Sequence, residues 1–172
     1  MGLLTFKGGI HPNDGKSLAK DKAIVTVMPK GDLIYPLSQH IGAPASPIVS
    51  VGDHVLKGQK IAEAGGFVSA PIYASVSGTV KAIEPHFNPT GSKVNCIVVE
   101  NDGEYQEVEY TPAKPLDELT KEEILNLIGE AGIVGMGGAG FPTCVKLKPA
   151  KPVDTILLNG CECEPLLTAD HR

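Results

Sequence analysis

Apolar and polar residues alternate with a period of two over most of the first hundred positions, which is the pattern of half-buried β-strands. Between residues 49 and 62 the alternating runs are short and are separated by a Gly-Asp turn and a Lys-Gly turn. Four further alternating or β-branched runs predict strands at residues 24–28, 33–37, 76–82 and 94–100. This half of the chain is therefore predicted to be almost entirely β.

The period changes to that of a helix after residue 119. Thr120 and Glu123 have the spacing of a capping box, in which the threonine hydroxyl and the glutamate carboxylate each bond the other residue's backbone N–H. Apolar residues then recur at helical spacing as Ile124, Leu127, Ile128 and Ala131. We expect a helix over residues 120–131 that ends at Gly132, and a buried strand over residues 153–159.

These patterns divide the chain into four segments. Residues 1–23 are expected to be an irregular arm that lies over the surface of the next domain, and residues 24–103 a β domain. Residues 104–119 are polar and contain Pro112 and Pro115, so they are read as a linker. Residues 120–172 then start an α/β domain. The predicted fold class is α+β overall, and the ending directly after a loop predicts a longer protein.

Composition narrows the possible functions. The 172 residues are 42% hydrophobic and 20% charged, a balance typical of globular proteins. A net charge of −5 and the absence of a basic stripe exclude nucleic acid as an expected partner. No apolar run reaches the ~20 residues that span a bilayer, so no direct membrane insertion is expected. The four cysteines are too few and too unevenly spaced for a disulfide framework, which favours a cytoplasmic location.

The sequence GMGGAGFPT at residues 135–143 has a glycine density that no regular element tolerates. Gly135, Gly137 and Gly140 satisfy G-x-G-x-x-G, but a helix precedes them where a dinucleotide-binding fold has a strand. The glycines suit either an anion-binding nest of backbone amides or a plain connector. The Phe141 side chain could stack on a planar ring, or it could be buried and close the loop. Lys146 and Lys148 could supply positive charge to a phosphate, or they could be solvated surface lysines.

The sequence NGCECEP at residues 159–165 follows the strand predicted at 153–159. Ligands of open α/β sheets bind at such a position, and Asn159, Glu162 and Glu164 are suited to ribose hydroxyls or a flavin edge. Cys161 and Cys163 lack a second ligand pair, so no metal site is expected and they are read as loop-filling residues. The histidines form no ligand set, and no Ser/His/Asp arrangement is visible, so no catalytic residue is assigned.

Residues 51–62 and 70–80 resemble the barrel-sandwich hybrid of biotinyl and lipoyl domains. Those domains carry a modifiable lysine at a hairpin tip, whereas the corresponding tip here, GGFVS at residues 65–69, has none. The resemblance therefore implies the fold without the swinging-arm function of a covalent cofactor carrier.

The segments at residues 135–143, 159–165 and 168–172, together with Lys146, resemble the FMN/NADH-binding domain of the NADH-oxidising flavoprotein of respiratory complex I. Cys161 stands where that pattern has an aspartate. With the β domain in front and the opening FKGGIHP at residues 6–12, the chain resembles the family of C subunits of Rnf electron transport complexes, the ion-translocating ferredoxin:NAD oxidoreductases. The resemblance extends from residue 6 to the end.

This resemblance implies FMN on the glycine loop with Lys146 and Asn159 beside it, the nicotinamide nucleotide over Phe141, and Glu164 near its ribose. The cofactor-binding residues so implied are Gly135, Gly137, Gly138, Gly140, Phe141, Lys146, Asn159, Glu162 and Glu164. Family members carry their 4Fe-4S clusters on cysteine motifs that this chain does not contain.

The implied function is electron transfer between NAD(H), FMN and iron–sulfur clusters. The expected partners are the other subunits of a membrane-bound electron transport complex, and the expected location is peripheral, on the cytoplasmic side of the membrane. We expect the chain to be inactive by itself. The alternative interpretation is a non-catalytic assembly or docking module that binds no cofactor.

Overall fold

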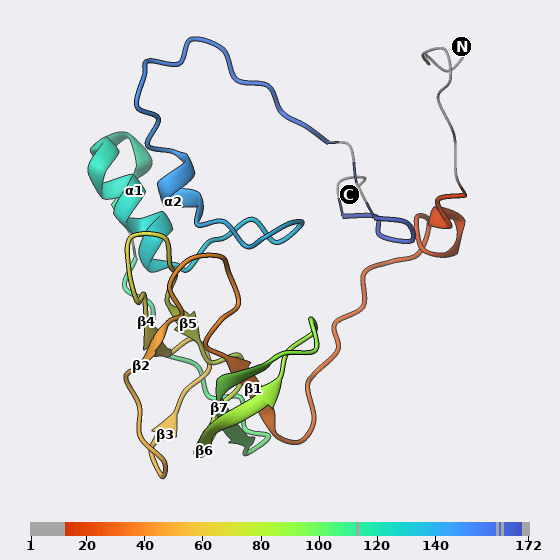
Figure 1. Ribbon diagram of the computed structural model, residues 1–172, viewed down its shortest axis with the longest axis vertical. Coiled ribbons are helices and arrows are strands. Elements are labelled where there is room, and N and C mark those ends of the chain that lie inside the picture. The colour runs from red at the N-terminus through yellow and green to blue at the C-terminus, as the bar shows by residue number, and fades with distance from the viewer. Residues whose placement is uncertain (1–12, 113, 161, 163, 170–172) are drawn as a thin grey trace. The chain divides into compact units, whose positions relative to one another are not determined.

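The computed structural model describes residues 13–112, 114–160, 162 and 164–169 (Figure 1). It divides into two compact units, and each is described by itself. The larger unit is Met28–Pro152, and the smaller one joins Met1–Val27 to Val153–Arg172. The glycine loop, defined here as residues 135–140, belongs to the larger unit, whereas the acidic loop, residues 159–165, belongs to the smaller one.

Two antiparallel sheets form most of the larger unit. One sheet has four strands in the order β1-β7-β6-β3, and the other has three in the order β2-β4-β5. The strands, which we call the barrel, are β1 Leu33–Pro36, β2 Ser46–Pro47, β3 His54–Val55, β4 Lys60–Glu63, β5 Ile72–Tyr73, β6 Gly78–Phe87 and β7 Lys93–Asn101. The strands predicted at 33–37, 76–82 and 94–100 are confirmed as β1, β6 and β7, with shifted ends.

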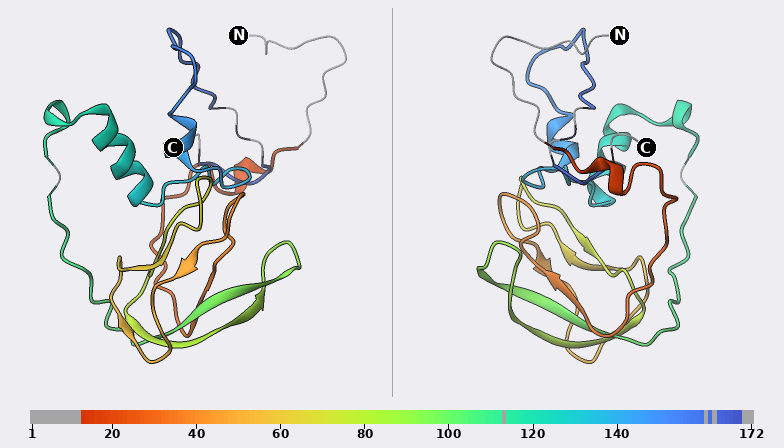
Figure 2. Two further views of the ribbon diagram at one scale, coloured as in Figure 1. Left: turned by 60° about the vertical axis from the view of Figure 1, so that its left-hand side comes forward. Right: turned by 90° about the vertical axis from the view of Figure 1, so that its right-hand side faces the viewer.

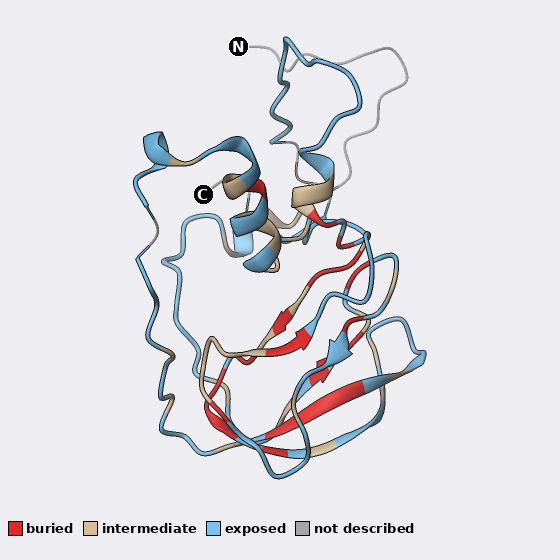
Figure 3. Cartoon of the chain, turned by 90° about the vertical axis from the view of Figure 1, so that its left-hand side faces the viewer, coloured by how far each residue is buried: buried red, intermediate tan, exposed pale blue. Residues whose placement is uncertain are grey.

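The long β6–β7 hairpin pairs from Gly78 with Asn101 to Phe87 with Lys93 (Figure 2). Side chains from both sheets pack into one core, and the buried segments lie on strands of both sheets and on the loops that adjoin them (Figure 3). The fully buried apolar side chains of this core are Val55, Ile61, Ala62, Val76, Val80, Ile97 and Val99. Alternation holds along the first half of β6, whereas four consecutive residues of β7 and two of β4 are buried, and the two sheets cover one another.

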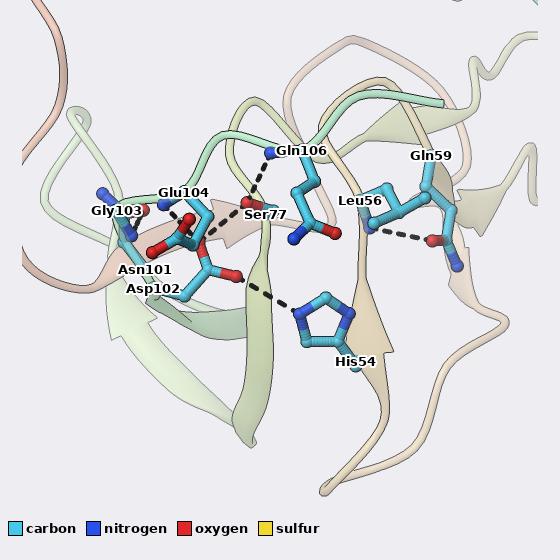
Figure 4. A network of polar contacts seen from close by, with 9 residues as sticks. All are labelled: His54, Leu56, Gln59, Ser77, Asn101, Asp102, Gly103, Glu104 and Gln106. Carbon is cyan, nitrogen blue, oxygen red and sulfur yellow. Dashed lines mark hydrogen bonds and ion pairs between the residues drawn. The ribbon is translucent and has the colours of Figure 1, made fainter. Parts of the chain in front are cut away.

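A polar network fastens β3 to the segment that follows β7 (Figure 4). Asp102 accepts hydrogen bonds from the Ser77 hydroxyl at 2.7 Å and from the Glu104 amide at 2.8 Å, and it pairs with Nε2 of His54 at 3.2 Å. The Glu104 amide, followed by the Ser77 hydroxyl, holds the pKa of Asp102 below its usual value. Asp102 lies between Ser77 and His54, so the order differs from that of a Ser-His-Asp triad, in which the histidine contacts the serine.

The predicted helix is confirmed as α1, Lys121–Glu130, with its capping box. Glu123 donates its amide to the Thr120 hydroxyl, and its carboxylate accepts the Thr120 amide at 2.8 Å. The backbone amide of Thr120, then the ammonium of Lys114, lower the pKa of Glu123 to about 2. A 3-10 turn, η2 Leu116–Glu118, precedes α1, and the short α2, Thr143–Lys146, follows the glycine loop.

Helix α1 is fastened to the three-stranded sheet of the barrel. Lys60 on β4 contacts the Glu130 carboxylate at 2.5 Å, and the Tyr73 hydroxyl on β5 donates to the Glu130 carbonyl. The Glu130 carboxylate raises the pKa of Lys60, and burial raises that of Tyr73. The end of α1, from which the glycine loop departs, therefore lies against the barrel.

Two predicted strands are wrong. Residues 24–28 and 153–159 form no strand, and their apolar side chains are exposed. Ile24, for example, is 80% exposed and Leu158 94% exposed. Both runs have strand-like composition, but a strand also needs a neighbouring backbone to bond, and no other described residue pairs with them. Local propensity alone did not decide the structure.

In the smaller unit the described N-terminal residues form a turn and a short 3-10 helix, η1 Lys16–Leu18. The amides of Gly15 and Lys16 are held by the side chains of Asn13 and Asp14, respectively. The described part of the arm therefore contains a turn. None of the helices in the described part of the chain has the length and apolarity needed to cross a lipid bilayer.

Substitution of Ser77 tests the network in Figure 4. Ser77 is fully buried and accepts the Gln106 amide at 2.9 Å, so Ser77→Ala leaves that amide and one Asp102 oxygen without this partner. We expect the free energy of unfolding, measured by urea denaturation, to fall by about 1–3 kcal/mol. The exposed Ser92→Ala is the control. Equal effects of the two substitutions would contradict the role given to Ser77.

The capping box predicts a dependence of stability on pH. Glu123 has a pKa of about 2 in the folded chain against 4.5 as its ordinary value, so its contribution is complete above about pH 4.5. That contribution is lost as the pH falls toward 2. In urea denaturation Glu123→Gln is expected to be less stable than wild type at pH 7 and to lose less stability between pH 4.5 and 2. Glu122→Gln, in the same exposed turn, should keep the wild-type slope.

Candidate functional site

The glycine loop is a closed loop between α1 and α2. Val134 and Pro142 form an antiparallel bridge at its base. The Gly135 amide donates to the Phe141 carbonyl at 2.9 Å, and the Thr143 amide donates to the Ile133 carbonyl at 3.0 Å. Two amides, those of Gly138 and Gly140, share the Gly135 carbonyl. These bonds define the loop conformation.

Gly140 packs directly against the backbone of residues 39 and 40. A Cβ atom at this position would lie 2.9 Å from both the Gln39 carbonyl oxygen and the His40 Cα, and its φ is +67°, in the left-handed region. The next contact is a hydrogen bond at 3.0 Å from the Ile41 amide to the Ala139 carbonyl. Only glycine can adopt this backbone conformation readily and also allow the two backbones to come this close. Gly140 is therefore required by the packing of this chain itself.

Gly137 and Gly138 face a different environment. A Cβ added to either would meet no atom of the chain within 4 Å, and neither has a positive φ. The space that a side chain would occupy at either position is open, so the packing of the chain does not require glycine there. Within the described residues, the amides of Met136, Gly137 and Ala139 have no hydrogen-bond acceptor. An exposed stretch of bare backbone with available N–H groups is the form of an anion nest.

The two side chains predicted to accompany the loop lie just beyond it. Phe141 is 36% exposed, so its side chain is partly covered by the chain and partly open to solvent. Lys146 is the last residue of α2 and is exposed. Burial of Pro142 between them anchors the start of α2. The larger unit therefore carries the four glycines, Phe141 and Lys146 on one continuous segment.

The remaining predicted site residues, Asn159, Glu162 and Glu164, lie in the smaller unit. Asn159 and Glu164 are exposed, whereas the Glu162 side chain is only 7% exposed. Glu162 accepts the Ala169 amide at 2.5 Å and pairs with Lys16 at 2.9 Å. Cys161 and Cys163, read from the sequence as loop-filling residues, lie outside the described residues.

Sequence reasoning missed the residues that hold the two loops. Residues 39–41 contact the glycine loop across about a hundred positions, and Lys16 contacts the acidic loop across 146. No local signal marks either set, because each depends on a backbone approach that only the fold creates. Among the described residues, no group of three or more His, Cys, Asp or Glu side chains is arranged to hold a metal ion.

Comparison with known protein families separates the two halves of the chain. Residues 4–104 match the family described as the RnfC barrel sandwich hybrid domain, and residues 128–172 match the Nuo51 FMN-binding domain. The first match covers the barrel. The chain belongs to the RnfC family. The predicted β barrel-sandwich hybrid, followed by the beginning of an FMN-binding domain, is thereby confirmed.

The curated relatives of this chain support its assignment to the RnfC family. It is 51% identical over 99% of its length to the C subunit of the proton-translocating ferredoxin:NAD(+) oxidoreductase complex of Clostridium ljungdahlii. It is 46% identical over 98% to the Na(+)-translocating counterpart of Acetobacterium woodii, and 41% identical over 98% to the C subunit of the ion-translocating oxidoreductase complex of Vibrio cholerae. The chain spans 38%, 39% and 22% of those proteins, respectively.

The glycines of the loop are expected to differ in their effect on folding. Gly140→Ala forces a Cβ against the backbone of residues 39 and 40 at positive φ, and should lower the free energy of unfolding by more than about 1 kcal/mol. Gly137→Ala meets open space and should change it by less than about 0.5 kcal/mol. Urea denaturation of the two variants side by side is the measurement. A larger loss in Gly137→Ala would contradict this division.

Proposed function

We propose that this chain is the N-terminal part of a peripheral electron-transfer subunit that moves electrons between NAD(H), FMN and iron–sulfur clusters. The observation that carries the proposal is the bare, unobstructed backbone at Gly137 and Gly138, in the segment that matches an FMN-binding domain. The names of the relatives, which are subunits of ferredoxin:NAD(+) oxidoreductase complexes, support the same reaction class.

The glycine loop fits a flat anionic cofactor. A side chain at Gly137 or Gly138 would fill the open space beside the loop, and three amides there have no acceptor among the described residues. Phosphate oxygens accept such amides, and a ring system can lie against backbone that carries no Cβ. When bound, FMN supplies hydride and single-electron chemistry, which the side chains of the protein do not.

The tasks of this chain are then to bind, orient and tune the cofactor. We assign the loop glycines to the FMN surface and the exposed Lys146 to its phosphate. Asn159, whose amide group both donates and accepts, suits the flavin edge or the ribityl chain. Phe141 is placed beside the nicotinamide nucleotide, and the carboxylates of Glu162 and Glu164 near ribose hydroxyls. No acid–base pair is required for hydride transfer, and none is assigned.

The complete protein extends beyond this chain. We keep the division into an arm at 1–23, a barrel domain at 24–103, a linker at 104–119 and an FMN/NAD-binding domain from residue 120. The 4Fe-4S clusters belong to segments outside this chain. The partners are the other subunits of a membrane-bound, ion-translocating complex, and the location is peripheral, on the cytoplasmic side of the membrane.

A second function for the barrel is assembly. Phe67, in the hairpin tip that carries lysine in carrier domains, is 77% exposed, and Phe87, the last residue of β6, is 70% exposed. Exposed aromatic side chains are typical of the centres of protein interfaces. In this alternative the chain is a non-catalytic docking module that binds neither FMN nor NADH.

Titration of FMN fluorescence tests the proposal. The full-length protein is expected to bind FMN and quench its fluorescence, and Gly137→Val should weaken binding about tenfold or more, equivalent to ~1.4 kcal/mol, without loss of folding. Lys146→Met should weaken it as well, whereas Lys148→Met, two residues later and also exposed, is the matched control. A full-length protein that binds neither FMN nor NADH would refute the oxidoreductase function and leave the docking function.

A further inference from the structure

Two segments far apart in sequence are joined in the smaller unit. Residues 13–18, with η1, lie against Glu162 and residues 164–169, which include the end of the acidic loop. The Leu166 amide donates to the Asp14 carbonyl at 2.6 Å, and the Lys16 ammonium donates to the Leu167 carbonyl at 2.5 Å. The N-terminal arm thus contacts a segment that begins almost 150 residues later.

Lys16 is the centre of this contact. Its ammonium group also pairs with the Glu162 carboxylate at 2.9 Å and lies 3.4 Å from the Glu164 carbonyl. One ammonium group therefore meets one carboxylate and two carbonyls, which uses its three donors. The Glu162 side chain is 7% exposed and that of Lys16 24% exposed. A carboxylate removed from water to this extent is stable only when it is paired.

The backbone at the contact is unusual as well. Leu166 has φ +71°, a left-handed conformation that a bulky side chain rarely adopts. Its own amide bonds Asp14, and the next carbonyl bonds Lys16, so the arm holds the backbone on both sides of the outlier. Gly15, at φ +62°, leaves room for the Leu166 side chain, because a Cβ there would overlap a Leu166 methyl carbon. Outliers of this kind persist where surrounding contacts fix them.

We propose that Lys16 is a positioning residue for the nucleotide site, holding Glu162 and residues 164–167 in the conformation that binds the cofactor. The proposal rests on the function proposed above, since it requires the acidic loop to face FMN or NADH. Lys16 acts through Glu162 and the carbonyls of Glu164 and Leu167. Because Lys16 belongs to the described part of the N-terminal arm, a residue that precedes the barrel takes part in holding a segment that follows the barrel in sequence.

The test uses Lys16→Met in the full-length protein, with two readouts. Hydrogen–deuterium exchange without ligand reports the contact itself: the amides of Leu166 and Ala169 should exchange faster in the variant. Nucleotide titration and steady-state kinetics report the consequence: the FMN dissociation constant and the NADH KM should each rise about tenfold or more, equivalent to ~1.4 kcal/mol of binding free energy. The kcat at saturating FMN and NADH should change much less.

Two control variants separate positioning from general stability. Lys16→Arg keeps the charge and several donors and should recover most of the affinity. Lys30→Met removes an exposed lysine that forms no ion pair with any other described residue, and it should behave as wild type. If Lys16→Met and Lys16→Arg lose affinity equally, the positive charge at this position does not hold the loop, and the positioning role is rejected.

The remaining outcomes are distinct. If the amides of Leu166 and Ala169 exchange at the same rate in Lys16→Met as in wild type, the contact between Lys16 and this segment is rejected. Faster exchange with unchanged FMN affinity and NADH KM rejects positioning, while the proposed function stands because the wild type binds. A wild-type protein that binds neither nucleotide overturns the proposed function, and the positioning role with it, even when exchange still reports the contact. Faster exchange together with weaker binding, recovered in Lys16→Arg, supports the inference.

Discussion

The backbone approach at Gly140 is the constraint on which the position of the glycine loop depends. At this point the loop touches residues 39 and 40 without an intervening side chain, and the Ile41–Ala139 hydrogen bond lies directly beside it. Backbone contacts of this kind permit little adjustment, because they have no rotatable side chain to absorb a displacement. With Lys60 and Tyr73 holding the end of α1, the loop is fixed to the barrel at both of its ends.

This arrangement gives the barrel a use that differs from that of carrier domains with a related fold. In those domains the hairpin tip presents a lysine, whereas here residues 65–69 contain none. The tip packs instead on the chain near Pro44, since a Cβ at Gly65 would overlap the Pro44 carbonyl oxygen. The same sheets that elsewhere support a mobile arm serve here as a fixed platform for the loop that follows α1. Fold and function are separable in this respect.

How far the sequence predicts this structure depends on whether a signal is local. The α1 capping box requires only Thr120 and Glu123, and it was predicted correctly because both partners lie within one turn. The strand predicted at 153–159 was wrong because its apolar residues say nothing about a neighbouring backbone. The glycine loop was recognised by composition, but the sequence did not distinguish Gly140, which packing requires, from Gly137 and Gly138, which it does not. The Lys16–Glu162 pair had no signal at all, since neither residue marks the other across 146 positions.

The exposed run at residues 155–158 has a consequence for how the chain behaves in solution. Ile156, Leu157 and Leu158 are each at least 80% exposed, and the run carries no charge and no proline. Exposed apolar segments of this composition pair readily with an identical segment of another molecule. Self-association of the chain at high concentration is then expected to involve this run. Asp154 and Lys151, just before it, supply the charges that oppose such stacking.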